Sequence, residues 1–200
     1  MPLSDDSARG AGWRPSRKLL VLVPVLIAAQ ALILLAMGRS PICPCGTVKL
    51  WHGLRDGENS QHIFDLYSFT HVIHGFLLYF CLWLAARNSP IALRLVLAVL
   101  IEGLWEVLEN SDFIISRYRT ATISRTYFGD SIINSVFDTV SMLVGFVLAS
   151  RLPVWSIVLI AAIFEVGLAY FIHDNLTLNT VMLVHPFDAI KVWQSTAPLN

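Results

Sequence analysis

The chain has 200 residues, of which 56% are hydrophobic and only 14% are charged. A soluble domain carries about 25% charged residues, so this composition excludes an ordinary water-soluble domain. The formal net charge is zero, which argues against a nucleic-acid partner. Several continuous apolar runs approach the roughly 20 residues that an α-helix needs to cross a bilayer. We therefore expect an all-α fold, a polytopic integral membrane bundle of about five transmembrane helices.

The first part of the chain, residues 1–18, is polar and rich in Gly, Ser and Arg, and we expect it to be disordered. Basic residues at its end precede the apolar run Leu19–Met37. This run is longer than the apolar part of a secretory signal and ends without a small-x-small cleavage site, which favours a retained signal anchor. The basic flank places the N-terminus in the cytoplasm.

Four further apolar runs follow, each bounded by Arg, Pro or a polar segment. We expect these spans at about Ser68–Ala86, Ile91–Glu109, Ile132–Ser150 and Val154–Ile172. Residues 19–195 then form a single transmembrane domain with outside loops at 38–65 and 110–129. Basic residues are equally divided between the two sides, so the orientation depends on the first helix alone. The tail 176–193 is too polar to span and is expected to lie at the membrane interface.

The polar residues of these spans are concentrated near the outer ends. In chain order they are His71, His74, Glu102, Glu106, Glu109, Asp130, Asn134, Asp138, Ser141 and Glu165. Ionisable side chains inside a membrane rarely face lipid and normally face the bundle interior or a wet cavity. With a rise of 1.5 Å per residue, four different spans each place one such residue roughly 10 Å below the outer surface. The sequence therefore predicts one shared polar site, to which these four spans contribute His74, Glu102, Asp138 and Glu165.

Imidazole and carboxylate groups that converge from facing helices suit Zn²⁺, Fe or Mn²⁺. The expected metal ligands are His71, His74, Glu106, Asp138 and Glu165. The expected catalytic residues are Glu102 and Glu106, with Glu102 as a general base or as a group that orients a ligand. With an open ligand position, metal-bound water would attack a phosphoester, acyl or peptide bond. This predicts a metal-dependent hydrolase or transferase acting at the outer interface on a lipid or lipid-linked envelope substrate.

Other interpretations of the same residues stay open. The histidine pair can contact headgroups instead of a metal, and Glu109 and Asp130 can be solvated helix ends. The acids can also pair with arginines of the polar segment to hold helices together, namely Arg117, Arg119 and Arg125. The alternative functions are accordingly a transporter or proton-relay component, or a structural membrane assembly protein. Against a relay, the inner halves of the spans carry no acid or imidazole to complete a path.

The outside loop 38–65 carries Cys43-Pro44-Cys45, followed by His52 and His62. A disulfide between residues two apart is strained. Two thiolates with these histidines would instead bind a soft metal such as Cu(I) or Zn²⁺. A tight Pro-Gly turn with redox-labile thiols is the alternative interpretation.

Four segments carry a resemblance to a known family. They are ICPCGTVKLWHG at 42–53, ENSQH at 58–62, WEVLENS at 105–111 and DNLTLN at 174–179. Over nearly the whole chain beyond residue 18, the sequence resembles a bacterial inner-membrane family of unknown function. The resemblance implies a multi-pass protein of the inner (plasma) membrane, with the lipid bilayer as partner, and supplies no activity. A weaker similarity to VanZ-like and YjdF-like membrane proteins rests on His74-Gly75-Phe76 and on the stripe from Asp130 to Asp138 and Gly145.

Overall fold

A computed structural model describes residues 17–54, 56–122, 124 and 126–196. Almost all of the secondary structure in this part of the chain is helical, which confirms the prediction of an all-α fold. The helices are α1 Arg17–Leu20, α2 Leu22–Ala36, α3 Ser68–Ala85, α4 Ile91–Glu109, α5 Asp112–Ala121, α6 Ile132–Arg151, α7 Val154–Ile172, α8 Leu176–Val184 and α9 Asp188–Ser195. The predicted disordered segment 1–18 lies outside the described residues, apart from the two that begin α1.

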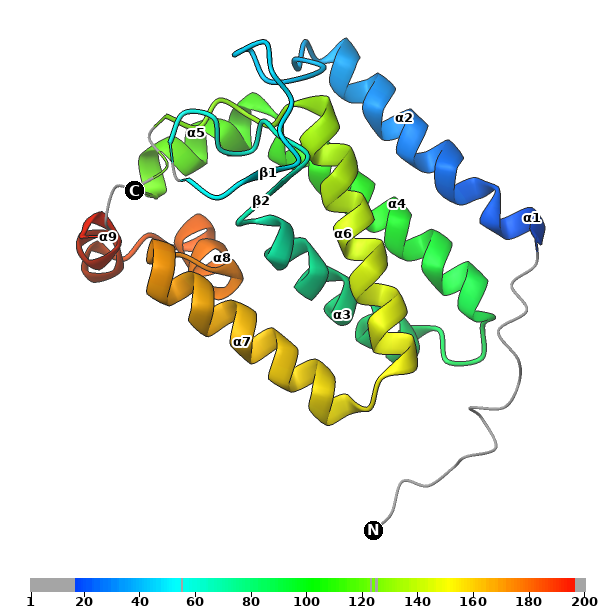
Figure 1. Cartoon of the computed structure of the whole chain (residues 1–200). Coiled ribbons are helices and arrows are strands. Elements are labelled where there is room, and N and C mark those ends of the chain that lie inside the picture. The colour runs from blue at the N-terminus through cyan, green and yellow to red at the C-terminus, as the bar shows by residue number, and fades with distance from the viewer. Residues whose placement is uncertain (1–16, 55, 123, 125, 197–200) are drawn as a thin grey trace.

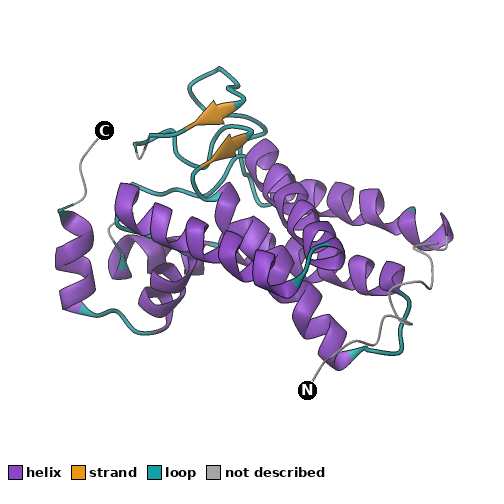
Figure 2. Cartoon of the chain, turned by 60° about the horizontal axis from the view of Figure 1, so that its bottom comes forward, coloured by secondary structure: helices purple, strands orange, loops and turns teal. Residues whose placement is uncertain are grey.

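Helices α2, α3, α4 and α6 form a central bundle, and α7 lies against α3 (Figure 1). Two short strands, β1 Trp51–His52 and β2 Phe64–Asp65, pair in parallel within the loop that precedes α3. Figure 2 shows this strand pair as a small cap over the helices. The cap, α5, α8 and α9 lie toward the end of the bundle where α3 and α6 begin, which we call the loop end.

The helix boundaries follow local sequence signals. Pro90 and Pro153 immediately precede α4 and α7, where a proline disfavours helical geometry in the residue before it. Side-chain oxygens of Ser111, Ser131 and Asn175 accept the backbone N–H three residues later and so cap α5, α6 and α8. The segment 110–129, predicted to be a polar loop, contains helix α5, which its sequence pattern does not indicate.

Each of the five expected spans forms a helix. Three of them, α3, α6 and α7, are long and apolar enough to cross a membrane, judged by length and composition. The apolar helix α2 has 15 residues, and α4 carries Arg94 besides its three glutamates. Helix α7 leaves most of its apolar side chains uncovered, with Val154 78% and Val166 69% exposed. Such a continuous apolar surface marks a contact with lipid or with another protein.

The central bundle has an apolar half and a polar half. Away from the loop end, α4 and α6 enclose a core of buried residues, namely Leu95, Ala98, Val99, Met142 and Phe146. Toward the loop end, the interior also holds many buried polar residues, among them histidines, acids, serines and asparagines. This division places the chemistry of the molecule at one end of the bundle.

The closest approach of two helices is that of α3 and α6. A Cβ atom added to Gly75 would lie 2.1 Å from the carbonyl oxygen of Met142, and one added to Gly145 would lie 2.0 Å from that of Val72. These glycines let the two backbones touch, as small residues do between membrane helices.

We predict that Gly75→Ala or Gly145→Ala forces α3 and α6 apart. The expected loss is about 1–3 kcal/mol in the free energy of unfolding, because the backbone atoms in the way cannot move independently. The measurement is thermal or denaturant unfolding of the purified protein in detergent. Gly167→Ala in α7 is the matched control, since a Cβ there meets nothing within 4 Å. Equal stability of all three variants would contradict the predicted close contact.

Candidate functional site

Three helices bring the predicted histidines and acids together near the loop end. His71 and His74 on α3 are three residues apart, and their ring centroids lie 4.8 Å apart. Glu102 on α4 is buried between them, with Oε1 2.7 Å from His71 Nδ1 and 3.0 Å from His74 Nδ1. Oε1 of Glu102 therefore lies within hydrogen-bonding distance of both imidazoles.

Two further acids approach His71. Glu106 Oε1 lies 3.3 Å from His71 Nδ1, and Asp138 Oδ2 on α6 lies 3.9 Å from His71 Nε2. One donor atom each from His71, Glu106 and Asp138 falls within 4.8 Å of the others, and the same holds for His71, His74 and Glu102. Donor atoms this close can share one metal ion, whose bonds to N and O are about 2.0–2.2 Å. These five residues are called the His/carboxylate cluster below.

A hydrogen-bond chain from α2 supports Glu106. Ser135 Oγ donates to Glu106 Oε2 at 2.6 Å, and Gln30 Nε2 donates to Ser135 Oγ at 3.0 Å. Thr139 Oγ1 in turn donates to Gln30 Oε1 at 2.8 Å. All four residues are buried. Helices α2, α4 and α6 are thus joined through polar side chains directly behind the cluster.

The second oxygen of Glu106 is different. Glu106 is 0% exposed, and its Oε1 atom accepts no hydrogen bond. Asp138 is better satisfied, because Ser68 Oγ donates to its Oδ1 at 3.2 Å. A buried carboxylate oxygen without a donor is costly, and native structures rarely leave one. Glu106 Oε1 therefore marks a position where a partner atom belongs.

The cluster has no basic partner other than histidine among the described residues. The ion pairs of its carboxylates all involve His71 or His74. Arg117 instead donates to the carbonyls of Leu183 and Val184, and Arg119 donates to that of Tyr127. The interpretation in which these two arginines neutralise the acids is wrong, and Arg125 lies outside the described residues.

A cavity of about 420 Å³ adjoins the cluster, and His71, His74 and Asp138 form part of its wall. Helix α8 contributes an apolar part of the lining through Leu176, Leu183 and Val184. Its polar lining includes Tyr118, Tyr127, Glu109 and Asp130. The site therefore combines an apolar wall with a few polar groups, as ligand pockets do.

The tyrosines connect this lining to two acids. Tyr118 Oη donates to Glu109 Oε1 at 2.7 Å, and Tyr127 Oη donates to Asp130 Oδ1 at 2.9 Å. Asn110 Nδ2 donates to Asp130 Oδ2 at 2.7 Å. Burial, and then the negative charge of Glu109, raise the pKa of Asp130 to about 7. The interpretation of Asp130 as a solvated helix end is wrong, because the residue is buried.

Glu165 is the one expected ligand that the structure places elsewhere. Its Oε1 accepts the backbone N–H of Leu176 at 3.0 Å, and its Oε2 accepts that of Thr177 at 3.2 Å. The carboxylate thus caps the first turn of α8 and neutralises its unpaired N–H groups. Helix α7 lies beside the central bundle, so α3, α4 and α6 bring their histidines and acids together, whereas Glu165 stays outside the cluster.

Comparison with known proteins gives the family. A family model described as "Protein of unknown function (DUF2585)" matches residues 34–196. A UPF0314 protein of Agrobacterium fabrum is 56% identical over 174 residues, covering 86% of this chain and 88% of its own. A UPF0314 protein of Sinorhizobium fredii is 50% identical over 193 residues, covering 96% of each chain. The chain belongs to the UPF0314 family. This confirms the prediction of an uncharacterised bacterial family.

The range that matches the family model contains the whole His/carboxylate cluster, so the cluster lies within the UPF0314 domain. No solved structure matches this UPF0314 chain.

Sequence reasoning missed several residues that support the site. Gln30 carries a signal in the sequence, because it is the only polar side chain in the run Leu19–Met37. Ser68 and Ser135 had none, because serines are common at helix starts and on small-residue faces. Tyr118 and Tyr127 also had none, since their place on the cavity wall depends on how α5 folds back.

We predict that Asp130 makes stability depend on pH. Its pKa of about 7 in the folded protein exceeds the value of roughly 3.9 in an unfolded chain. Between these values the folded state holds the extra proton, so the free energy of unfolding falls as pH rises from about 4 to 7. Denaturant unfolding across this range should show a weaker decline for Asp130→Asn. Asp112→Asn, at an exposed carboxylate, is the control, and an unchanged slope in Asp130→Asn would contradict the prediction.

Proposed function

We propose that this UPF0314 chain is an integral protein of the bacterial inner membrane whose His/carboxylate cluster binds a divalent metal ion. The metal is Zn²⁺, Fe²⁺ or Mn²⁺, and it serves the hydrolysis or transfer of a group on a lipid or lipid-linked envelope substrate. Membrane insertion is supported by three helices long and apolar enough to span and by the uncovered apolar surface of α7. The N-terminus lies in the cytoplasm in this proposal, and the cluster lies near the outer face.

The observation that carries the proposal is the buried Glu106 Oε1 without a hydrogen-bond donor, next to His71 and Asp138. Three carboxylates share this interior with two imidazoles, and no described Lys or Arg pairs with them. If all three carboxylates are ionised, they outnumber the positive charges even with both imidazoles protonated. Buried charges of one sign are stabilised by pairing or by metal coordination. A divalent cation would supply the missing positive charge.

The hydrogen bonds of Glu102 fit the same proposal. A metal-bound histidine usually donates its other ring N–H to a carboxylate, which fixes the tautomer and the ring orientation. Both His71 and His74 present Nδ1 to Glu102 Oε1. With the proton on Nδ1, the Nε2 lone pair of each ring is free, and that of His71 faces Asp138. Glu102 then orients both rings, and the metal ligands in this proposal are His71, Glu106 and Asp138, whose donor atoms lie within 4.8 Å of one another, with His74 next to them.

The cavity gives this centre an approach for substrate. His71, His74 and Asp138 line it, together with apolar side chains of α8. An amphiphilic substrate would place its polar group against the cluster and its apolar part against α8 and the surrounding lipid. A divalent metal held by the cluster would supply Lewis-acid activation of water for attack on a phosphoester or acyl group. In this proposal Glu102, which is hydrogen-bonded to both imidazoles, would take up the released proton.

The proton-relay alternative has less support. The interior beyond the cluster, away from the loop end, is the apolar core of Leu95, Ala98, Val99, Met142 and Phe146. A relay needs titratable groups or water along its path, and this core offers neither donors nor acceptors on its side chains.

Metal binding tests the proposal directly. We expect the protein, purified from membranes in detergent without a reductant so that the Cys43–Cys45 disulfide is intact, and loaded with Zn²⁺, Fe²⁺ or Mn²⁺, to hold about one metal ion per chain. Glu106→Gln and Asp138→Asn should weaken binding at least 10–100-fold, because each removes a charged ligand and keeps its shape. Glu165→Gln is the matched control, since Glu165 lies outside the cluster.

A wild-type protein that binds none of the three metals would rule out the proposed metal centre. Unchanged metal binding in both Glu106→Gln and Asp138→Asn would do the same. Loss of thermal stability in these variants without any bound metal would point to a structural role.

A second prediction concerns catalysis. The probe is a total lipid extract of Agrobacterium fabrum in mixed micelles, with products identified by mass spectrometry. We expect a metal-dependent product, and a rate about 10²–10⁴-fold lower for Glu102→Gln at saturating metal, because the amide cannot take up a proton. Glu165→Gln should retain the wild-type rate. Full activity of Glu102→Gln would rule out a catalytic role for Glu102, and no metal-dependent product from the wild type would rule out lipid chemistry.

A further inference from the structure

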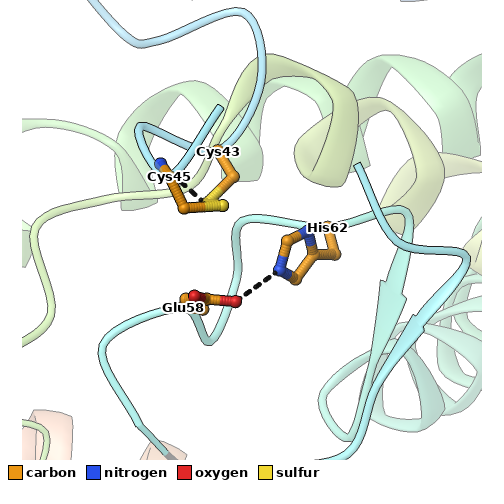
Figure 3. Close-up of side chains that lie close together, drawn as sticks. All are labelled: Cys43, Cys45, Glu58 and His62. Carbon is orange, nitrogen blue, oxygen red and sulfur yellow. Dashed lines mark hydrogen bonds and ion pairs between the residues drawn. A yellow bond between two sulfur atoms is a disulfide. The ribbon is translucent and has the colours of Figure 1, made fainter. Parts of the chain in front are cut away.

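A second group of metal-binding side chains lies in the loop before α3, separate from the His/carboxylate cluster. It consists of Cys43, Cys45, Glu58 and His62, which each offer one donor atom within 4.8 Å of the others. Figure 3 shows the Glu58 carboxylate pointing to the His62 ring, with the two cysteines on the neighbouring turn. Cys43 and His62 are buried, whereas Cys45 is exposed.

The structure decides which histidine accompanies the cysteines. His52, which the sequence offered equally, directs Nε2 to Asp56 Oδ1 at 2.9 Å. His62 Nε2 instead lies 3.1 Å from Glu58 Oε2, and it is the imidazole grouped with the two sulfur atoms. Two sulfurs, one imidazole and one carboxylate form a donor set typical of Zn²⁺.

We propose that the loop binds one thiophilic divalent ion of the zinc class through these four side chains once the Cys43–Cys45 disulfide is reduced. The structure contains a disulfide between these two residues, which are two apart in sequence, whereas the sequence favoured two free thiolates. Closing so short a loop removes little chain entropy from the unfolded state, so the bond adds little stability. The exposed sulfur of Cys45 is also open to attack by a reductant.

The reduction is a two-electron step. A dithiol reductant transfers two electrons and two protons to the Cys43–Cys45 bond, which gives two thiols and leaves the reductant as a disulfide. The metal ion then displaces both thiol protons to solvent and binds the thiolates. The backbone N–H of Cys45 already donates to Cys43 Sγ at 3.1 Å, and this bond stabilises a thiolate there.

Glu58 and His62 are arranged to complete the site. Lys49 and His62 lower the pKa of the Glu58 carboxyl, so it is ionised at neutral pH. Binding of the metal through His62 Nε2 moves the ring proton to Nδ1, at the cost of the 3.3 Å hydrogen bond from the Lys49 backbone N–H. The metal then replaces the proton that now lies between His62 and Glu58.

The site is also placed to act on the cavity. Asn134 Nδ2 donates to the carbonyl of His62 at 2.8 Å, and this bond holds the loop before α3 against α6. The neighbouring Asn59 and Ser60 line the cavity beside the His/carboxylate cluster. A metal held at His62 therefore fixes the part of the loop that covers this cavity.

The test uses full-length protein in detergent in a Cys81→Ser background, because Cys81 is the free cysteine of the described chain. Co²⁺ is the spectroscopic probe, since a thiolate bound to it gives a charge-transfer absorption that carboxylate and imidazole ligands do not. After reduction with a phosphine, we expect one Co²⁺ per chain with this absorption, displaced by Zn²⁺. The oxidised protein and Cys43→Ser should lack it.

His62→Asn and Glu58→Gln should weaken Co²⁺ binding at the thiolates tenfold or more, and His52→Gln should leave it unchanged. Reduced protein without thiolate absorption would overturn the proposal, as would equal binding in His62→Asn and Glu58→Gln. Glu106→Gln should retain the absorption, because the His/carboxylate cluster contains no sulfur. The loop site and the proposed membrane metal centre can therefore fail independently.

Discussion

The contact between α3 and α6 at Gly75 and Gly145 is the constraint on which the other features depend. His71 lies one turn before Gly75, and Asp138 lies two turns before Gly145. Residues four and seven apart share a helix face, so the approach of the two backbones also brings these side chains together. A larger residue at either glycine would separate the helices and, with them, the imidazole and the carboxylate. Packing and polar chemistry in this bundle are therefore two results of one geometry.

The two halves of the bundle contribute differently. Apolar side chains fill the half away from the loop end, where burial supplies the stability that a helical bundle needs. Near the loop end, the interior holds acids and imidazoles whose desolvation is unfavourable. The hydrogen-bond chain from Gln30 through Ser135 to Glu106 offsets part of this desolvation cost. Oε1 of Glu106, which faces His71, accepts no hydrogen bond, and a cation would bind at this position.

Much of this arrangement could be predicted from the sequence. Apolar runs bounded by Pro and Arg gave the five long helices, and spacings of three and four residues placed His71 with His74 and Glu102 with Glu106 on common faces. The position of Glu165 could not be predicted, because α7 is apolar on all sides and its pattern does not fix which face turns inward. Burial of Asp130 depends on Tyr127 and Asn110, which the folding of a polar segment brings near. The choice of His62 over His52 likewise depends on the pairing of β1 with β2, which no local pattern indicates.

Helix α8 is attached to the end of α7 rather than to the central bundle. Glu165 accepts the first N–H groups of α8, and the amide of Asn175 donates to the Glu165 carbonyl, which joins the start of α8 to α7. Arg117 of α5 holds the other end of α8 through two carbonyls. Helix α7 packs mainly on α3, whereas α8 supplies the apolar lining of the cavity. A change in the position of α7 relative to α5 would therefore displace α8 and change the width of the cavity beside the histidines.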